Sequence, residues 1–116
     1  MKIIILDTNF LIYCANFKVD LFSEIERICH FPYKLKVLDA TIKELEIVKP
    51  KGLSLIKKFI EKLEVIKAED HYVDDELTNL SEKGYIIATQ DKELKDRLKG
   101  PVIVIRQKKY LELRKL

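Results

Sequence analysis

Few cysteines, histidines and glycines occur in the sequence, and each shortage excludes a kind of site. Cys14 and Cys29 are the only cysteines, and no Cys or His spacing is that of a zinc site. We therefore expect two buried thiols in a reducing compartment. His30 and His71 are isolated from each other and from any cysteine. No pattern indicates a Ser/His/Asp triad, a glycine loop that holds phosphate, or a nucleotide cofactor.

Long apolar runs are also missing. No run approaches the ~20 residues that span a bilayer, and the start of the chain lacks the apolar core of a signal peptide, so we expect a cytoplasmic protein with no membrane contact. A composition of 47% hydrophobic and 35% charged residues is typical of a soluble globular protein. We expect residues 1–116 to form one domain without linkers or repeats. The net charge of +3 is too small to indicate a polyanionic partner by itself.

A short apolar run that ends at a carboxylate organises the rest of the chain. Residues 3–6 are three isoleucines and a leucine, which is typical of a strand buried on both faces, as in a parallel sheet. Asp7 then lies at the carboxyl end of this strand. Open α/β sheets place their ligands at that edge.

The remaining apolar segments alternate between strand and helix patterns. Alternation of this kind predicts a three-layer α/β/α domain with a mostly parallel central sheet and helices on both faces. We expect Asp39 or Thr41 to cap the third helix, Gly84 to end the fifth, and residues 108–116 to form a helix or a loose tail. Strand patterns occupy residues 35–38, 65–66, 85–89 and 102–105, and helix patterns occupy residues 10–15, 21–30, 39–47, 53–63, 74–83 and 91–98.

Separate segments deliver carboxylates to one edge of this sheet. Like charges at short range raise one another's pKa values and destabilise a fold, and divalent cations relieve that repulsion. Oxygen ligands without histidine or cysteine favour Mg²⁺ or Mn²⁺. Two such ions could activate a water for phosphodiester cleavage, so the arrangement predicts a nuclease. The acids are Asp7 after the first strand, Glu44 in the helix after the second, Asp74 and Asp75 before the fourth, and Asp91 after it.

Each acid also has an ordinary structural role open to it. Asp7 could be a turn former. Asp74, Asp75 and Asp91 could be helix caps or partners of a helix dipole, and Glu44 could belong to a solvated helix face. The arrangement of the acids, and no single one of them, predicts the site.

In order along the chain, these segments resemble the four acidic motifs of the PIN domain nucleases. The resemblance rests on Asp7-Thr8-Asn9, Glu44-Leu45, residues 73–77 and residues 88–94, and it covers essentially the whole chain. It implies a small parallel sheet and a metal-dependent ribonuclease that uses Mg²⁺ or Mn²⁺. The metal-binding acids that it implies are Asp7, Glu44, Asp75 and Asp91, with Asp74 as the rival of Asp75 and with Thr8, Asn9 and Thr89 in support.

Within the family, residues 88–94 and 104–110 resemble the branch that includes the small-subunit ribosomal RNA processing nucleases. Gln90 departs from the Asn that is usual there, and the zinc-binding cysteines of some relatives are absent. The other large branch contains the toxins of toxin-antitoxin pairs. A ribosome-assembly protein or an antitoxin is therefore a possible partner. A homodimer is also possible, through the surface of residues 10–15 or through the carboxyl-terminal tail.

A basic cluster near the carboxyl terminus could bind phosphates of single-stranded RNA. A solvated face is the alternative interpretation of this cluster. Two other functions stay open for the chain: a non-catalytic RNA- or protein-binding module of the same fold, and a phosphatase on a related α/β fold. The basic cluster consists of Arg106, Lys108, Lys109, Arg114 and Lys115, with Tyr110 interleaved.

Overall fold

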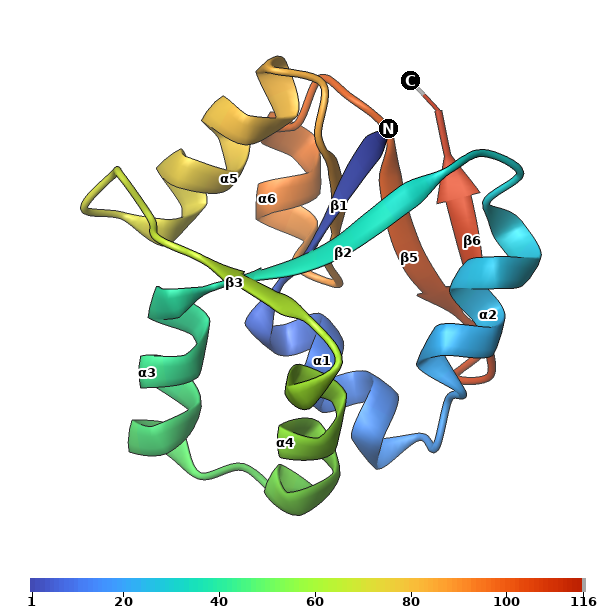
Figure 1. The fold of residues 1–116 in the computed structure, drawn as a ribbon, viewed down its shortest axis with the longest axis vertical. Coiled ribbons are helices and arrows are strands. Elements are labelled where there is room, and N and C mark those ends of the chain that lie inside the picture. The colour runs from blue at the N-terminus through green and yellow to red at the C-terminus, as the bar shows by residue number, and fades with distance from the viewer. Residues whose placement is uncertain (116) are drawn as a thin grey trace.

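In the computed structural model, which describes residues 1–115, a six-stranded sheet lies between two layers of helices (Figure 1). The strand order is β3-β2-β1-β4-β5-β6, and every pairing is parallel except that of β5 with β6. The predicted fold class is confirmed. The strands are β1 (Lys2–Leu6), β2 (Tyr33–Leu38), β3 (Glu64–Ile66), β4 (Ile86–Ala88), β5 (Val102–Arg106) and β6 (Tyr110–Arg114). The helices are α1 (Thr8–Asn16), α2 (Leu21–Ile28), α3 (Asp39–Val48), α4 (Leu53–Glu61), α5 (Val73–Glu82) and α6 (Lys92–Arg97).

The centre of the sheet is β1, which pairs with β2 on one side and β4 on the other. Ile4 lies opposite Leu35 of β2, and Ile5 lies opposite Ile87 of β4. The chain leaves β1 toward β2 and returns later to β4 on the opposite side. Open α/β sheets place their ligands where connections diverge in this way, at the carboxyl ends of the two strands. Asp7 follows β1 directly at this point.

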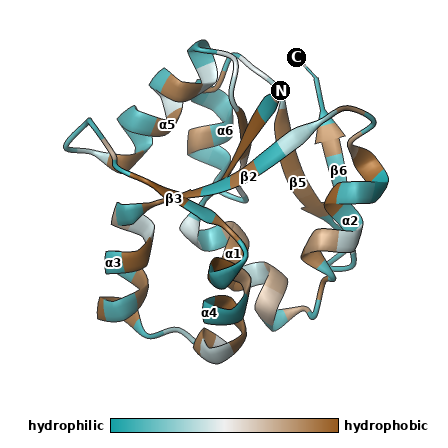
Figure 2. Cartoon of the chain, viewed as in Figure 1, coloured by the Kyte–Doolittle hydropathy of each residue, from teal (hydrophilic) through white to brown (hydrophobic). Residues whose placement is uncertain are grey.

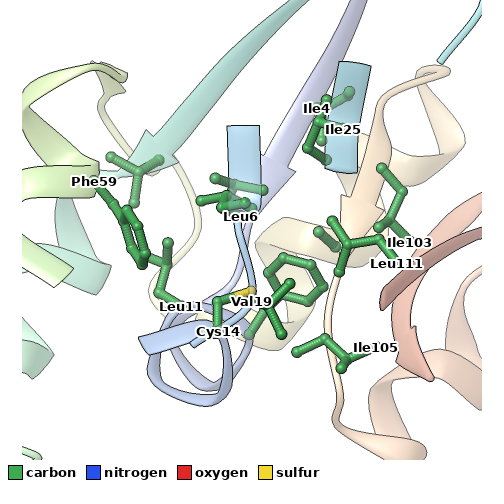
Figure 3. Packing of buried hydrophobic residues seen from close by; sticks show 14 of the residues in the cluster. Ile4, Leu6, Leu11, Cys14, Val19, Ile25, Phe59, Ile103, Ile105 and Leu111 are labelled. Atoms are coloured by element: carbon green, nitrogen blue, oxygen red, sulfur yellow. The ribbon is translucent and has the colours of Figure 1, made fainter. Parts of the chain in front are cut away.

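Two hydrophobic cores lie on the two faces of the sheet. Ile4 and Leu6 face the layer formed by α1 to α4, where Figure 3 shows them near Ile25 and Phe59. Ile5 faces the other layer, formed by α5 and α6. Successive strand residues point to opposite faces, so an uninterrupted apolar run is required where both faces are covered. Figure 2 accordingly shows β1 and β5 as hydrophobic along most of their length, while the helices are striped.

The last strand differs from expectation. The prediction of a helix or a loose tail for residues 108–116 is wrong for the described part, because β6 pairs antiparallel with β5. Leu111 is 1% exposed and joins the core, while Tyr110 and Glu112 point to the opposite face. This alternation with a period of two is the strand signal in the segment. Leu116 lies outside the described residues.

Helix α2 covers the outer edge of β6. The backbone N–H of Leu111 donates to Glu24 Oε1 (2.8 Å), and the Leu111 carbonyl accepts from the guanidinium of Arg27 (2.8 Å). Glu24 and Arg27 also pair with each other at 2.9 Å, and this hydrogen bond lowers the pKa of Glu24. The pair occupies a backbone position that would otherwise be open to another strand.

The expected cap of α3 is wrong. The N-cap residue is Leu38, and no side chain caps this helix. The Asp39 carboxylate accepts from the backbone N–H of Ala68 instead (3.0 Å), and that bond lowers the pKa of Asp39. Thr41 is 1% exposed and faces the loop after β1. A side chain that has a tertiary partner is not available to the helix end.

Expectations about the cysteines and about the first helix have opposite outcomes. Cys14 and Cys29 are both unpaired and buried, as predicted, and burial raises the pKa of Cys14 to about 12. Most of the expected dimer surface over residues 10–15 is buried inside the chain, with Phe10 and Leu11 fully covered and Tyr13 exposed. The prediction of an apolar dimer surface there is therefore wrong.

None of the helices in residues 1–115 is long and apolar enough to cross a membrane.

Gly84 ends α5, as predicted. Its φ is +97°, and its N–H donates to the Ser81 carbonyl (3.0 Å), while the N–H of Tyr85 donates to the Leu80 carbonyl (3.0 Å). This pair of bonds is the Schellman arrangement, which requires a left-handed residue just after the helix.

Replacing Gly84 by alanine is expected to lower the free energy of unfolding by about 1 kcal/mol, the cost of a Cβ in left-handed backbone. A Cβ at this position would meet no atom within 4 Å, so no steric clash adds to that cost. Chemical denaturation of G84A measures it, with K83A at the preceding exposed position as the control. An unchanged midpoint for G84A would contradict the assignment.

Candidate functional site

The Asp7 carboxylate is held at both of its oxygens. Asp7 is the N-cap of α1 and is only 8% exposed. The backbone N–H of Thr8 donates to Oδ1, and the hydroxyl of Thr89 donates to Oδ2, both at 2.8 Å. A carboxylate has about four acceptor sites on its two oxygens. Two of them are used here, so Asp7 is oriented and still has capacity to bind a ligand.

Thr89, directly after β4, joins the residues around Asp7. It is fully buried, and its hydroxyl accepts from the backbone N–H of Asp91 (3.1 Å) and lies 3.3 Å from Asn9 Oδ1. Asn9 Oδ1 also accepts from the backbone N–H of Gln90 (3.2 Å). One network therefore holds the loop after β1 against the loop after β4.

Burial is the main influence on the pKa of Asp7, and it raises that pKa because the charged form loses water. The hydrogen bonds from Thr89 and Thr8 act in the opposite direction. The negative charges of Asp74 and Glu44 raise the pKa further. The net direction is upward. A buried carboxylate beside two other acids is an arrangement that a cation stabilises.

Helix α3 brings Glu44 and Thr41 to this site. The hydroxyl of Thr8 lies 3.1 Å from Thr41 Oγ1 and 3.4 Å from Glu44 Oε2. Thr41 is a site residue that sequence reasoning missed. The available signal was its spacing, because residues three apart on a helix share a face. Glu44 therefore lies beside the residue that follows Asp7, and its role as a metal ligand stays a prediction.

The adjacent acids Asp74 and Asp75 differ in their surroundings. Asp75 Oδ1 lies 2.6 Å from the guanidinium of Arg97, and this hydrogen bond raises the pKa of the arginine. Asp74 is the member of the pair whose charge acts on Asp7. Asp74 is therefore the acid of the pair that acts on Asp7 through its charge, whereas the resemblance favoured Asp75. Arg97 had no counterpart in the sequence reasoning.

Asp91 serves as the N-cap of α6. Its Oδ1 accepts from the backbone N–H of Leu94 (3.1 Å), which is the ordinary role considered for it from sequence. Its backbone is bound to Thr89, which places this helix start beside Asp7. A role of Asp91 in metal binding stays a prediction.

The donor chemistry of the site suits a hard divalent cation. Within residues 1–115, no three His, Cys, Asp or Glu side chains lie close enough to enclose an ion in the present arrangement. The side chains that converge are nevertheless carboxylates and hydroxyls, which Mg²⁺ and Mn²⁺ prefer. The repulsion that Asp74 and Glu44 exert on Asp7 is relieved when a cation binds.

The basic cluster is divided between two environments. Arg106 and Arg114 both pair with Glu112, at 3.7 and 2.7 Å. Lys108 lies in the turn between β5 and β6, with its Nζ 5.4 Å from the centroid of the Phe17 ring. An RNA-binding role for Arg106, Lys108 and Lys109 stays a prediction. The exposed lysines of the cluster are Lys108, Lys109 and Lys115.

A family model described as "PIN like domain" matches residues 4–108. The chain belongs to this PIN-like domain family, and the predicted family is confirmed. The matched segment includes all five candidate metal ligands: Asp7, Glu44, Asp74, Asp75 and Asp91.

Similar proteins agree with this assignment. Ribonuclease VapC4 of Methanocaldococcus jannaschii is 35% identical over 124 aligned residues, which cover 95% of each chain. The structure of the PIN domain endonuclease Utp24 has a TM-score of 0.82 at 24% identity and covers 98% of this chain and 92% of its own. The VapBC2 structure from Rickettsia felis, bound to a DNA fragment from the promoter, has a TM-score of 0.56 at 17% identity and covers 90% and 99%. At these identities, the two structures show the fold alone.

Replacing Asp7 by asparagine is expected to raise the melting temperature at pH 7 in the absence of metal. The amide can accept from Thr8 and donate to the Thr89 oxygen, and it carries no charge to bury. Because folding raises the pKa of Asp7 above its ordinary 3.8, the ionised form costs stability at neutral pH. That cost disappears as the pH falls through the folded pKa toward 3.8.

The gap in melting temperature between D7N and the wild type should therefore close between pH 7 and pH 4. Asp20 is the matched control, because it is an exposed N-cap of α2 and D20N removes the same charge. A D7N variant less stable than the wild type at pH 7 would contradict the account of Asp7.

Proposed function

We propose that this chain is a metal-dependent endoribonuclease that hydrolyses phosphodiester bonds in RNA. One observation carries the proposal: the Asp7 carboxylate is buried at the carboxyl end of β1, held by Thr8 and Thr89, with the charges of Asp74 and Glu44 directed at it. The 35% identity to Ribonuclease VapC4 supports RNA as the substrate class. Acids assembled at the cost of stability are typical of a site that binds cations.

Asp7, Glu44, Asp74 and Asp91 would hold Mg²⁺ or Mn²⁺. When bound, the metal would lower the pKa of a water nucleophile and neutralise charge on the phosphate. Thr89 and Thr8 keep both Asp7 oxygens in one orientation, and Thr89 also fixes the backbone of Asp91. These contacts let the acids keep their positions while the substrate binds and leaves.

Two biological roles fit this chemistry. Processing of ribosomal RNA in the cytoplasm, with a ribosome-assembly partner, is supported by the resemblance of residues 88–94 and 104–110 and by the fold shared with Utp24. A ribonuclease restrained by an antitoxin is the second candidate, and the similarity to VapC4 and the VapBC2 fold favours it. Growth arrest on expression of the wild type, absent with D7N, would select the second role.

With single-stranded RNA and Mn²⁺ or Mg²⁺, D7N is expected to cut at least roughly 100-fold more slowly than the wild type, because a central carboxylate is worth several kcal/mol to a metal site. EDTA should remove the wild-type activity, and D20N should keep it. Cleavage followed on a labelled RNA measures both effects. Metal-dependent cutting that survives in D7N would refute the proposal.

Manganese is expected to raise the melting temperature of the wild type more than that of D7N, because a ligand that binds only the folded state stabilises it. Thermal denaturation at millimolar manganese measures the difference and needs no knowledge of the substrate. If neither protein responds, the acids are caps and surface charges. The non-catalytic binding module would then be the better account.

The substitution D74N is expected to slow cleavage by roughly 10- to 100-fold, the usual effect of weakening a metal site. The substitution D75N should leave the rate of cleavage nearly unchanged, because Asp75 is paired with Arg97. Loss of that exposed pair should change the stability little, because water and salt screen it. The two substitutions remove the same charge from adjacent positions, so each is the control for the other. The reverse order of rates would assign the site to Asp75.

A further inference from the structure

Strained backbone gathers at one corner of the domain. Among residues 1–115, four residues other than glycine have positive φ. Three of them, Lys18, Gln107 and Lys108, lie where the connection from α1 to α2 meets the turn between β5 and β6. The contact between Lys108 and the Phe17 ring joins the two segments (5.4 Å), and Figure 1 shows them side by side. Left-handed backbone is unfavourable for residues other than glycine, because the Cβ approaches the following carbonyl oxygen. Strain of this kind is concentrated at functional sites.

This corner is strongly basic. Arg106 is paired with Glu112, whereas Lys18, Lys108 and Lys109 are exposed and form no ion pair among residues 1–115. We call Lys18, Arg106, Lys108 and Lys109 the basic corner. Lysines gathered at one corner without acidic partners make the local potential positive, which attracts phosphate groups.

Gln90 connects the basic corner to the acids. Its side-chain Oε1 accepts from the backbone N–H of Ile105 (2.6 Å), and its Nε2 donates to the Ile105 carbonyl (3.4 Å). Its own backbone N–H donates to Asn9 Oδ1 (3.2 Å). The amide therefore bonds both backbone groups of Ile105, as a neighbouring strand would, and prolongs the contact between β4 and β5 beyond the bond from Thr89 to Ile103.

Ile105 directly precedes Arg106, so Gln90 sets where the turn projects relative to the acids. β4 and β5 are parallel, so the turn after β5 leaves from the same edge of the sheet as the network around Thr89. The acids repel a polyanion on their own. An RNA strand that reaches them therefore needs cationic partners elsewhere along this edge.

We propose that the basic corner binds backbone phosphates of single-stranded RNA that runs past the acids, and that Gln90 is the positioning residue that holds the corner in register with them. This inference rests on the proposed nuclease function. The contacts go to phosphates and carry no base readout, so binding is independent of sequence and sensitive to salt.

The first test is the salt dependence of RNA binding. The probe is a fluorescently labelled single-stranded oligonucleotide, bound to D7N so that it is not cut, and the dissociation constant is measured over a range of salt concentrations. Each phosphate contact to a single strand contributes roughly 0.7 to the slope of log Kd against log salt. The double substitution K18Q/K108Q is expected to lower that slope by about 1.4. Its matched control is K57Q/K58Q, which removes two exposed lysines from α4.

The second test separates positioning by Gln90 from general stability. Q90L removes both bonds to Ile105, and Q90N is the milder variant with a shorter amide. Each is expected to lower the salt slope in the same direction as K18Q/K108Q, and to have no further effect when added to K18Q/K108Q, because the lysine contacts are already gone. In the cutting enzyme, Q90N should raise KM more than it lowers kcat.

An unchanged salt slope in K18Q/K108Q, or an effect of Q90N that adds fully to it, would overturn the inference. If K57Q/K58Q lowers the salt slope as much as K18Q/K108Q does, the inference is also overturned, because any exposed lysine would then contribute equally. Binding is measured without cleavage, so these outcomes are distinct from failure of the nuclease assay. If the wild type cuts no RNA but K18Q/K108Q still lowers the salt slope of binding, the nuclease proposal is refuted. The basic corner would then remain an RNA-binding surface.

Discussion

The hydrogen bond from Thr89 to Asp7 is the contact on which the site depends. It joins the ends of two neighbouring parallel strands whose residues are 82 positions apart in sequence. The bond favours the ionised form of Asp7, while burial and two nearby acids disfavour it. The fold therefore keeps a carboxylate where its charge is poorly stabilised. The free-energy cost of this arrangement is offset by the well-packed central strands of the sheet.

The positions of the acids follow from the topology. The connections leave β1 and β4 in opposite directions, and both place polar residues directly after buried apolar strands. Thr8 and Thr41 extend the network to α3, so the helix that carries Glu44 is fixed to the same place. One polar network thus joins the first, second and fourth strand ends.

Much of the fold could be predicted from sequence because apolar runs and breaks report burial directly. Residues 3–6 and 102–105 are apolar because both faces of their strands are covered, and Gly84 ends its helix for a local reason. The roles of side chains that depend on tertiary partners could not be predicted from the neighbouring sequence. Asp75 pairs with Arg97 from another helix, Asp39 caps a loop rather than its own helix, and the turn after β5 forms without glycine or asparagine.

The ion pair of Glu24 and Arg27 that covers β6 has a consequence for how the chain is made. Leu111, its partner, is synthesised more than eighty residues later. Until β6 emerges from the ribosome, α2 has no strand to cover. Asp7 likewise has no hydrogen bond from Thr89 until β4 and the residue after it have been made. The acids can therefore come together once Thr89 and Asp91 have been made, whereas the edge of the sheet closes only when β6 follows.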